Sequence, residues 1–172
     1  MQDQLKAAVR DVPDFPIKGI IFKDITPILQ DPKLFRCAVD TLADRHKGKN
    51  LTAVVGIDAR GFIFAGAVAY KLGIGFIPVR KKGKLPWKTV VTSYTLEYGS
   101  ETSEMHIDAI AAGDNVIIVD DLLATGGTAM AAAKLVKELG GNIAEIDFLI
   151  ELAFLKGRDR LAGYNVFSAV QY

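Results

Sequence analysis

The sequence has a single cysteine and no long apolar run, and each shortage excludes a class of protein. Cys37 alone cannot form an internal disulfide, so we expect a reducing compartment and a cytoplasmic location. The closest approach to an apolar run, residues 61–70, ends at Lys71 and falls short of the roughly 20 residues that cross a bilayer. The first residues show no basic flank before an apolar core, so we expect neither a signal peptide nor a membrane partner.

An excess of one charge is also missing. The chain has 21 basic and 20 acidic residues, a net charge of +1, which favours neither nucleic acid nor an acidic surface as partner. The two histidines, His46 and His106, have no acid or cysteine at metal-ligand spacing, and we expect both at the surface. Half of the 172 residues are hydrophobic, which is enough for one core, and we expect one domain over residues 1–172.

Short apolar runs alternate with helical patterns along the chain. We predict strands at residues 52–57, 76–79, 90–98, 115–119, 144–152 and 166–170. We predict helices at residues 3–10, 31–42, 61–72, 127–139 and 156–161. Prolines and Gly19 break residues 11–31, which we expect to be an irregular surface segment. This alternation predicts an α/β fold with a mostly parallel twisted sheet and helices on both faces, in which ligands bind at the carboxyl ends of the strands.

The strongest functional signal lies at residues 116–128, where an apolar strand leads into two acids and a glycine-bearing loop that opens a helix. Glycines permit close backbone approach, and free N–H groups at a helix start bind phosphate. The acids suit sugar hydroxyls or a metal ion better than a phosphate. The segment therefore predicts a ribose 5-phosphate site, and the alternative is a capped turn with incidental acids. The residues concerned are Asp120, Asp121, Thr125, Gly126, Gly127 and Thr128.

A second junction between a strand and a helix carries Asp58, Ala59 and Arg60. Arginine is suited to clamp a pyrophosphate through paired N–H donors, and the alternative is a solvated arginine at a helix start. A basic cluster follows the next strand and suits a polyanion, unless it is only a solvated loop. It is too short for a nucleic-acid face. Its residues are Arg80, Lys81, Lys82, Lys84 and Lys88.

Residues 120–128 (DDLLATGGT) resemble the phosphoribosyl-pyrophosphate motif of the type I phosphoribosyltransferases, and look like its adenine-specific branch. Further segments that resemble the family in order are residues 14–27, 56–62, 79–86 and 96–99. The resemblance implies transfer of a phosphoribosyl group from phosphoribosyl pyrophosphate to adenine, a purine salvage reaction that gives AMP and pyrophosphate. It also implies a small N-terminal hood at about residues 11–31, a flexible β-arm or loop at about residues 94–106, and a homodimer.

The resemblance also implies roles for individual residues. Ribose-phosphate binding falls to Asp120, Asp121, Ala124, Thr125, Gly126, Gly127 and Thr128. Pyrophosphate binding falls to Asp58, Ala59, Arg60, Arg80, Lys81 and Lys84, with a cis peptide at Asp58–Ala59 and with Arg80 reaching the partner subunit's site. The base would lie between Ile21, Phe22 and the backbone amides near Lys23 on one side and Leu122 on the other.

Catalysis is assigned by the same resemblance to Arg60 and Glu97, with Tyr98 beside Glu97 in the loop. Arg60 would neutralise the leaving pyrophosphate, and Glu97 would accept a hydrogen bond from the base. Mg²⁺ would be bound mainly by pyrophosphate and ribose oxygens, with no direct protein ligand and with Asp120 or Asp121 contributing through water.

Three alternatives stay open at this stage. Hypoxanthine–guanine relatives place an aspartate at the position of Ala124, which argues against hypoxanthine but does not exclude xanthine. Ile21 and Phe22 also fit an ordinary core position. A regulator that only senses phosphoribosyl pyrophosphate is the rival class, although the presence of Arg60 and Glu97 favours an enzyme.

Overall fold

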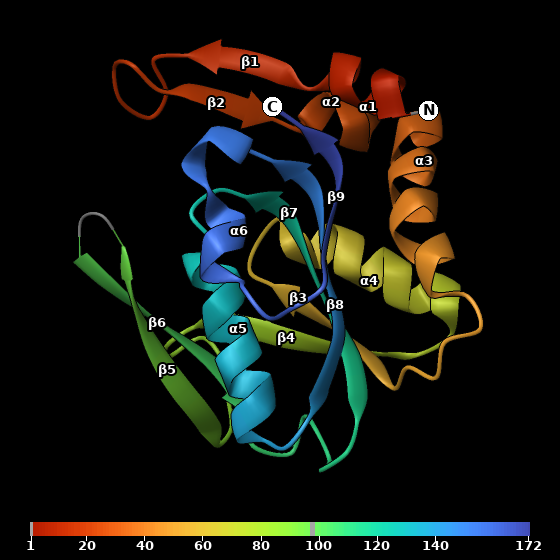
Figure 1. Ribbon diagram of the computed structural model, residues 1–172, viewed down its shortest axis with the longest axis vertical. Helices are drawn as coiled ribbons and strands as arrows, with labels where there is room; N and C mark the ends of the chain where they lie inside the picture. The colour runs from red at the N-terminus through yellow and green to blue at the C-terminus, as the bar shows by residue number, and fades with distance from the viewer. Residues whose placement is uncertain (1, 97–98) are drawn as a thin grey trace.

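The computed structural model describes residues 2–96 and 99–172, which form a seven-stranded sheet with helices on both faces (Figure 1). The strand order is β5-β6-β4-β3-β7-β8-β9. Strands β4, β3, β7, β8 and β9 pair in parallel, whereas β6 is antiparallel to both of its neighbours. The predicted α/β class with a mostly parallel sheet is confirmed. The strands are β3 (Ala53–Ile57), β4 (Gly75–Lys81), β5 (Thr89–Leu96), β6 (Gly99–His106), β7 (Asn115–Leu123), β8 (Asn142–Glu151) and β9 (Val166–Gln171).

Side chains of successive residues in the central strands point to opposite faces of the sheet, and both faces are buried. Val54 of β3 packs in the core under α3 and α4, and the next residue, Val55, packs in the core under α5. Ile117 and Ile118 of β7 alternate in the same way. Strands covered on both sides read as continuous apolar runs, which is why the sequence showed them clearly. The helices are α1 (Gln2–Ala8), α2 (Thr26–Gln30), α3 (Pro32–Ala43), α4 (Gly61–Leu72), α5 (Gly127–Glu138) and α6 (Gly157–Arg160).

The helix boundaries follow local signals in the sequence. The Asp31 carboxylate accepts hydrogen bonds from the backbone N–H groups of Lys33 and Leu34, at 2.7 and 3.1 Å, and so caps α3. Helix α4 ends at Gly73, whose φ of 69° is in the left-handed region. Among the residues that the structure describes, no helix is long and apolar enough to span a membrane.

Residues 11–31 are more regular than the sequence predicts. Strands β1 (Arg10–Pro13) and β2 (Ile21–Asp24) form an antiparallel hairpin, here called the hood hairpin (residues 10–24), and α2 follows it. The N–H of Gly19 donates to Asp14 Oδ1 at 2.7 Å and closes the turn. The expectation of an irregular segment was wrong because Pro16 lies in the turn and Pro13 at a strand end, where neither interrupts the pairing.

The segment expected as an arm and loop also contains a strand of the main sheet. Strand β6 pairs with β5 along its whole length and with Arg80 and Lys81 of β4. Its residues Ser103 and Glu104 are buried. The strand was missed because its sequence is polar, and its place in the sheet depends on partners rather than on an apolar pattern of its own.

Candidate active site

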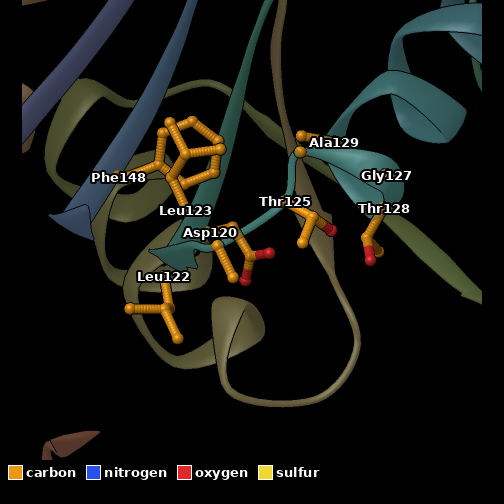
Figure 2. Close-up of a pocket in the computed structure, with 10 residues that line it drawn as sticks. Asp120, Leu122, Leu123, Thr125, Gly127, Thr128, Ala129 and Phe148 are labelled. Carbon is orange, nitrogen blue, oxygen red and sulfur yellow. The ribbon is translucent and has the colours of Figure 1, made fainter. Parts of the chain in front are cut away.

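The end of β7 and the start of α5 form a pocket at the carboxyl edge of the sheet. A cavity of ≈ 70 Å³ is lined by Asp120, residues 122–129 and Phe148 (Figure 2). Gly126 precedes the first turn of α5 with φ of 78°, so this turn needs a residue that tolerates the left-handed region. The start of a helix presents unpaired N–H groups to whatever fills such a cavity, which suits a phosphate.

The 58–61 loop after β3 touches residues 120–128, which comprise the end of β7, the turn after it and the start of α5 and are here called the 120–128 loop. The two strands are parallel neighbours, with Gly56 opposite Val119, so both loops leave the same edge of the sheet. A Cβ atom added to Gly61 would lie 2.5 Å from Asp120 Oδ1 and 3.2 Å from the Val119 carbonyl oxygen. Gly61 therefore permits a contact between the two loops that a larger residue would obstruct.

Arg60 connects this edge of the sheet to the hood hairpin. Its Nε lies 2.8 Å from Asp121 Oδ2, as an ion pair without the alignment of a hydrogen bond. Its guanidinium carbon lies 5.2 Å from the centre of the Phe22 ring. The Arg60 side chain is 39% exposed, so the guanidinium group is accessible to a ligand at the site.

The two acids of the 120–128 loop resist ionisation. Burial, and then the charge of Asp121, raise the pKa of Asp120 well above its ordinary value, although the Asp121 N–H donates to Asp120 Oδ1 at 2.8 Å. Burial also raises the pKa of Asp121, and the charge of Arg60 acts in the opposite direction. A cation or hydroxyl donors brought by a ligand would relieve this electrostatic cost.

Arg80 lies on the other side of the 58–61 loop. Its Nε donates to Asp58 Oδ2 at 2.8 Å, and its Nη1 donates to the Lys84 carbonyl oxygen at 3.1 Å. The Asp58–Ala59 peptide is cis, as the resemblance implies, and Ala59 is exposed. A second cavity of ≈ 90 Å³ lies here, with Asp58, Arg80 and Thr128 in its wall. Lys81 and Ser103 line it as well.

Glu104, which the sequence did not single out, holds the backbone of the segment that carries the basic cluster, here called the basic segment (residues 80–88). Its Oε1 accepts hydrogen bonds from the N–H groups of Lys84 and Leu85 at 2.9 and 2.8 Å, and its Oε2 accepts one from the Thr89 hydroxyl at 3.2 Å. Burial alone would raise the pKa of Glu104, but the backbone N–H groups of Leu85, Gly83 and Lys84 outweigh it and leave the pKa below its usual value. The exposed ammonium of Lys84 therefore extends from a backbone that a buried acid fixes.

The hood hairpin brings an aromatic surface to the same region. Ile21 of β2 is exposed, and Phe22 is half-buried with its ring edge-on to Phe15 at 5.2 Å. Leu122 lines the cavity of the 120–128 loop and is half-buried. Phe22 is linked to that loop through Arg60, so the residues predicted on the two sides of a base come from elements that meet at one place.

Lys23 has a different environment from its neighbours. Its Nζ lies 2.6 Å from Asp11 Oδ1 and 4.0 Å from the centre of the Tyr172 ring. These contacts hold the side chain within the fold, and a role for the backbone amides here in binding a base stays a prediction. The predicted catalytic Glu97 and its neighbour Tyr98 lie outside the residues that the structure describes.

Comparison with known proteins places this geometry in a family. The family model described as the phosphoribosyl transferase domain matches residues 25–168. The chain belongs to the phosphoribosyltransferase family. The adenine phosphoribosyltransferase of Roseiflexus sp. (strain RS-1) is 55% identical over 172 residues, which cover 100% of both chains. The crystal structure of adenine phosphoribosyltransferase from Thermoanaerobacter pseudethanolicus superimposes with a TM-score of 0.97 at 49% identity, covering 100% of each chain.

A further solved relative was crystallised with ligands. It is the adenine phosphoribosyltransferase of Saccharomyces cerevisiae in complex with D-2,5-dideoxy-2,5-imino-altritol 1,6-bisphosphate and adenine. Its TM-score with this phosphoribosyltransferase is 0.92 at 44% identity, and the match covers 98% of this chain and 97% of the yeast chain. The family that the five sequence segments resemble is thereby confirmed.

The sequence prediction for His46 was wrong. This phosphoribosyltransferase buries His46 almost completely, with Nε2 2.5 Å from Asp147 Oδ2 and 3.8 Å from Glu145 Oε2. The three residues have the donor atoms of a metal site, but Arg45 Nη2 lies 2.6 Å from Glu145 Oε1 and Lys49 Nζ lies 3.5 Å from its Oε2. We interpret the cluster as a buried network of hydrogen bonds and ion pairs. Both acids come from β8, about a hundred residues away, so local spacing gave no signal.

His106 is also less exposed than expected. It is half-buried, and its ring centre lies 6.5 Å from that of Trp87, which is exposed. The packing comes from the basic segment folding back on the end of β6. Neither histidine of this phosphoribosyltransferase lines the two cavities described above.

Proposed function

We propose that the chain transfers the phosphoribosyl group of phosphoribosyl pyrophosphate to adenine, giving AMP and pyrophosphate in purine salvage. The observation that carries the proposal is the contact between two loops suited to phosphate groups, at residues 58–61 and 120–128. The relatives named adenine phosphoribosyltransferase match the whole chain and support the choice of base.

Each loop binds one end of the donor in this proposal. The start of α5, with Thr125 and Thr128, binds the 5-phosphate, and Asp120 and Asp121 accept hydrogen bonds from the ribose hydroxyls. Arg60 then neutralises the charge that builds up on the pyrophosphate as it leaves. Ala124 to Gly127 contribute backbone N–H groups, and Ala59, Arg80, Lys81 and Lys84 lie on the pyrophosphate side.

The acids of the 120–128 loop fit a role beside Mg²⁺. Magnesium prefers oxygen ligands and retains several waters. Asp121 Oδ2 is buried and has no aligned hydrogen-bond donor among the described residues. Asp120 and Asp121 would hold the ion through water and through the substrate, and the ion would supply further neutralisation of the pyrophosphate.

Adenine fits between the hood hairpin and the end of β7. Phe22 and Ile21 offer apolar surface on one side, Leu122 on the other, and backbone amides near residue 23 read the edge of the base. The yeast relative solved with adenine supports a purine at such a site. Ala124 has only a methyl group where hypoxanthine–guanine relatives have an aspartate. Glu97 supplies a carboxylate instead, and accepts a hydrogen bond from the base as it reacts.

A homodimer and a cytoplasmic location belong to the same proposal. Helix α4 carries Ile63 and Tyr70 on its outer face, and Tyr70 is 91% exposed. Phe76 of β4 is exposed too, and Arg80 is on the same strand. Exposed aromatic residues of this kind favour association, and a second copy of the chain is the partner we propose. Cys37 as the only cysteine supports the cytoplasm.

An absorbance assay with phosphoribosyl pyrophosphate, Mg²⁺ and each purine tests the function. We expect turnover of adenine, and its loss when a chelator removes Mg²⁺. Preferential turnover of hypoxanthine, guanine or xanthine would contradict the assigned base. Turnover of none, with tight binding of phosphoribosyl pyrophosphate, would favour the sensing regulator instead.

A further inference from the structure

Helix α6 supports the 120–128 loop from behind through a contact between two glycines. A Cβ atom added to Gly126 would lie 2.5 Å from the carbonyl oxygen of Gly157, the first residue of α6. A Cβ atom added to Gly157 would collide with the Ala124 carbonyl oxygen and lie 2.9 Å from Leu123 Cδ1. The two backbones therefore touch, and the position of α6 limits the position of the loop.

An ion pair between Arg158 and Glu151 helps to hold α6 in this place. Arg158 donates from Nε to Glu151 Oε1 and Oε2 at 2.8 and 3.0 Å, and from Nη2 to Oε2 at 2.7 Å. Its Nη1 donates to the Val166 carbonyl oxygen at 2.8 Å, and its Nη2 reaches the Ser168 hydroxyl at 3.3 Å. Glu151 is buried and also accepts from Gln171 Nε2 at 3.1 Å. Paired bonds of this kind fix orientation as well as distance.

Glu151, the acid of this ion pair, belongs to β8, which is hydrogen-bonded to the 120–128 loop. Glu151 is the last residue of β8, and the next residue, Leu152, donates its N–H to the Leu123 carbonyl oxygen at 2.9 Å. Glu151 lies opposite Leu123 in the pairing of β7 with β8. The carboxylate that binds Arg158 is thus anchored beside Leu123, the residue directly before residues 124–126.

We propose that Arg158 and Gly157 are positioning residues for the 5-phosphate site, acting through α6 on residues 124–126 without touching the ligand. This inference rests on the proposed function, because it concerns the binding of phosphoribosyl pyrophosphate and AMP. The ion pair sets where α6 begins, and the absence of a side chain at Gly157 lets the loop settle against it. Ligands that carry a 5-phosphate depend on this support, whereas pyrophosphate does not.

The test compares Gly157→Ala with Gly66→Ala in the full chain. Gly66 lies on α4, where an added Cβ atom meets nothing within 4 Å, so it is the matched control. We expect Gly157→Ala to raise the KM for phosphoribosyl pyrophosphate on the order of 10–100-fold, because small misplacements of a binding group are costly. The KM for adenine and the inhibition by pyrophosphate should stay within about twofold of the wild type.

Arg158 is tested by substitution with lysine and with alanine. Lysine keeps the charge but cannot form the paired bonds, so we expect Arg158→Lys to raise the same KM and to weaken AMP binding. Arg158→Ala leaves a buried carboxylate without its partner, and if it fails to fold the lysine variant and Gly157→Ala still decide the matter. Arg36→Lys, on the exposed side of α3, is the control for the substitution itself.

The outcomes separate this inference from the proposed function. An active wild type with an unchanged KM for phosphoribosyl pyrophosphate in Gly157→Ala and Arg158→Lys would overturn the positioning role and leave the reaction intact. An equal loss towards all ligands, together with a lower Tm, would show a merely structural role and would also overturn it. A wild type that turns over no purine would instead contradict the reaction.

Discussion

Arg60 Nε lies 2.8 Å from Asp121 Oδ2, so a residue that follows β3 and a residue near the end of β7 meet as an ion pair at one edge of the sheet. The pair gives the buried acid a cation while leaving the guanidinium group accessible from outside. An anionic ligand that attracts Arg60 would take part of that cation away from Asp121. Binding at the pyrophosphate side and the ionisation of the acids are therefore coupled.

Arg60→Lys should lower kcat/KM by on the order of 10²-fold, because lysine cannot pair with Asp121, pack against Phe22 and present two parallel donors to a pyrophosphate. Steady-state kinetics with adenine and phosphoribosyl pyrophosphate measure the change. Arg36→Lys serves as the control. Wild-type kinetics in Arg60→Lys would remove this residue from the catalytic set.

Asp120→Asn should stabilise the free protein while it harms activity. Folded Asp120 keeps its proton to a higher pH than an unfolded aspartate, so stability is lost as the pH rises through the raised pKa. The amide removes this cost and can still accept the Asp121 N–H. A gain of about 1 kcal/mol would raise Tm by about 2–4 °C at pH 8. The gain should shrink towards pH 4, and a Tm gain that is the same at both pH values would contradict the assignment.

Glu104→Gln should loosen the backbone at Lys84 and Leu85 and lower stability by about 1–2 kcal/mol at pH 7, since hydrogen bonds to a charged acceptor are lost. The pKa of Glu104 is lowered in the fold, so its contribution is present at neutral pH and is lost as the pH falls below 4.5, through the folded pKa. Urea unfolding of both proteins across this range measures it. A difference that grows at acid pH would have the wrong sign.

Arg80 and Asp121 offer a test of sharing between subunits. If Arg80 contributes across a dimer interface, an inactive Arg80→Ala chain mixed with an inactive Asp121→Ala chain should regain part of the activity. Asp121→Ala is expected to be inactive through greatly weakened binding of phosphoribosyl pyrophosphate. In one subunit Arg80 donates to Asp58 of its own chain, so sharing requires that bond to open. No rescue despite proven exchange, or an active monomer by mass, would end the idea.

Glu97→Gln should slow the chemical step with adenine by about 10²–10⁴-fold, as expected for a lost proton acceptor. The loss should fall on kcat rather than on the affinity for phosphoribosyl pyrophosphate, because the contact strengthens as the base reacts. Product release can hide part of it in steady-state assays, so single-turnover rates are the measurement. Wild-type single-turnover rates would leave Glu97 without a catalytic role.

The sequence predicted the parts of the fold that carry their own pattern. Strand β3 is a short apolar run, and helix α4 is apolar and bounded by Gly61 and Gly73, so both were placed almost to the residue. Strand β6 was missed because its polar sequence joins the sheet only through β4 and β5. Residues 11–31 seemed irregular because prolines suggest breaks, although here Pro13 lies at the end of β1 and Pro16 in the turn, where neither interrupts the pairing.

The residues of the candidate site also divide into those that the sequence predicted and those that it missed. The resemblance named the residues of the 58–61 and 120–128 loops, and the structure brings both together. Glu104, Arg158 and Gly157 gave no signal, because what they do depends on neighbours 7 to 31 residues away: Glu104 on Lys84 and Leu85, Arg158 on Glu151, and Gly157 on Gly126. The environment of His46 was equally invisible, since its acidic partners lie on β8.

The pairing of β3 with β7 sets the spacing between the 58–61 loop and the 120–128 loop. Neighbouring strands lie about 4.8 Å apart, and each of these two ends in a loop that suits one phosphate group. In the proposed function, a molecule with charged groups at both ends of a ribose spans the two loops, while one with a single phosphate engages only one of them. Gly61 keeps that interval short, because any side chain there would push the loops apart. Discrimination between donor and product can thus begin with backbone spacing, before any side chain reads the base.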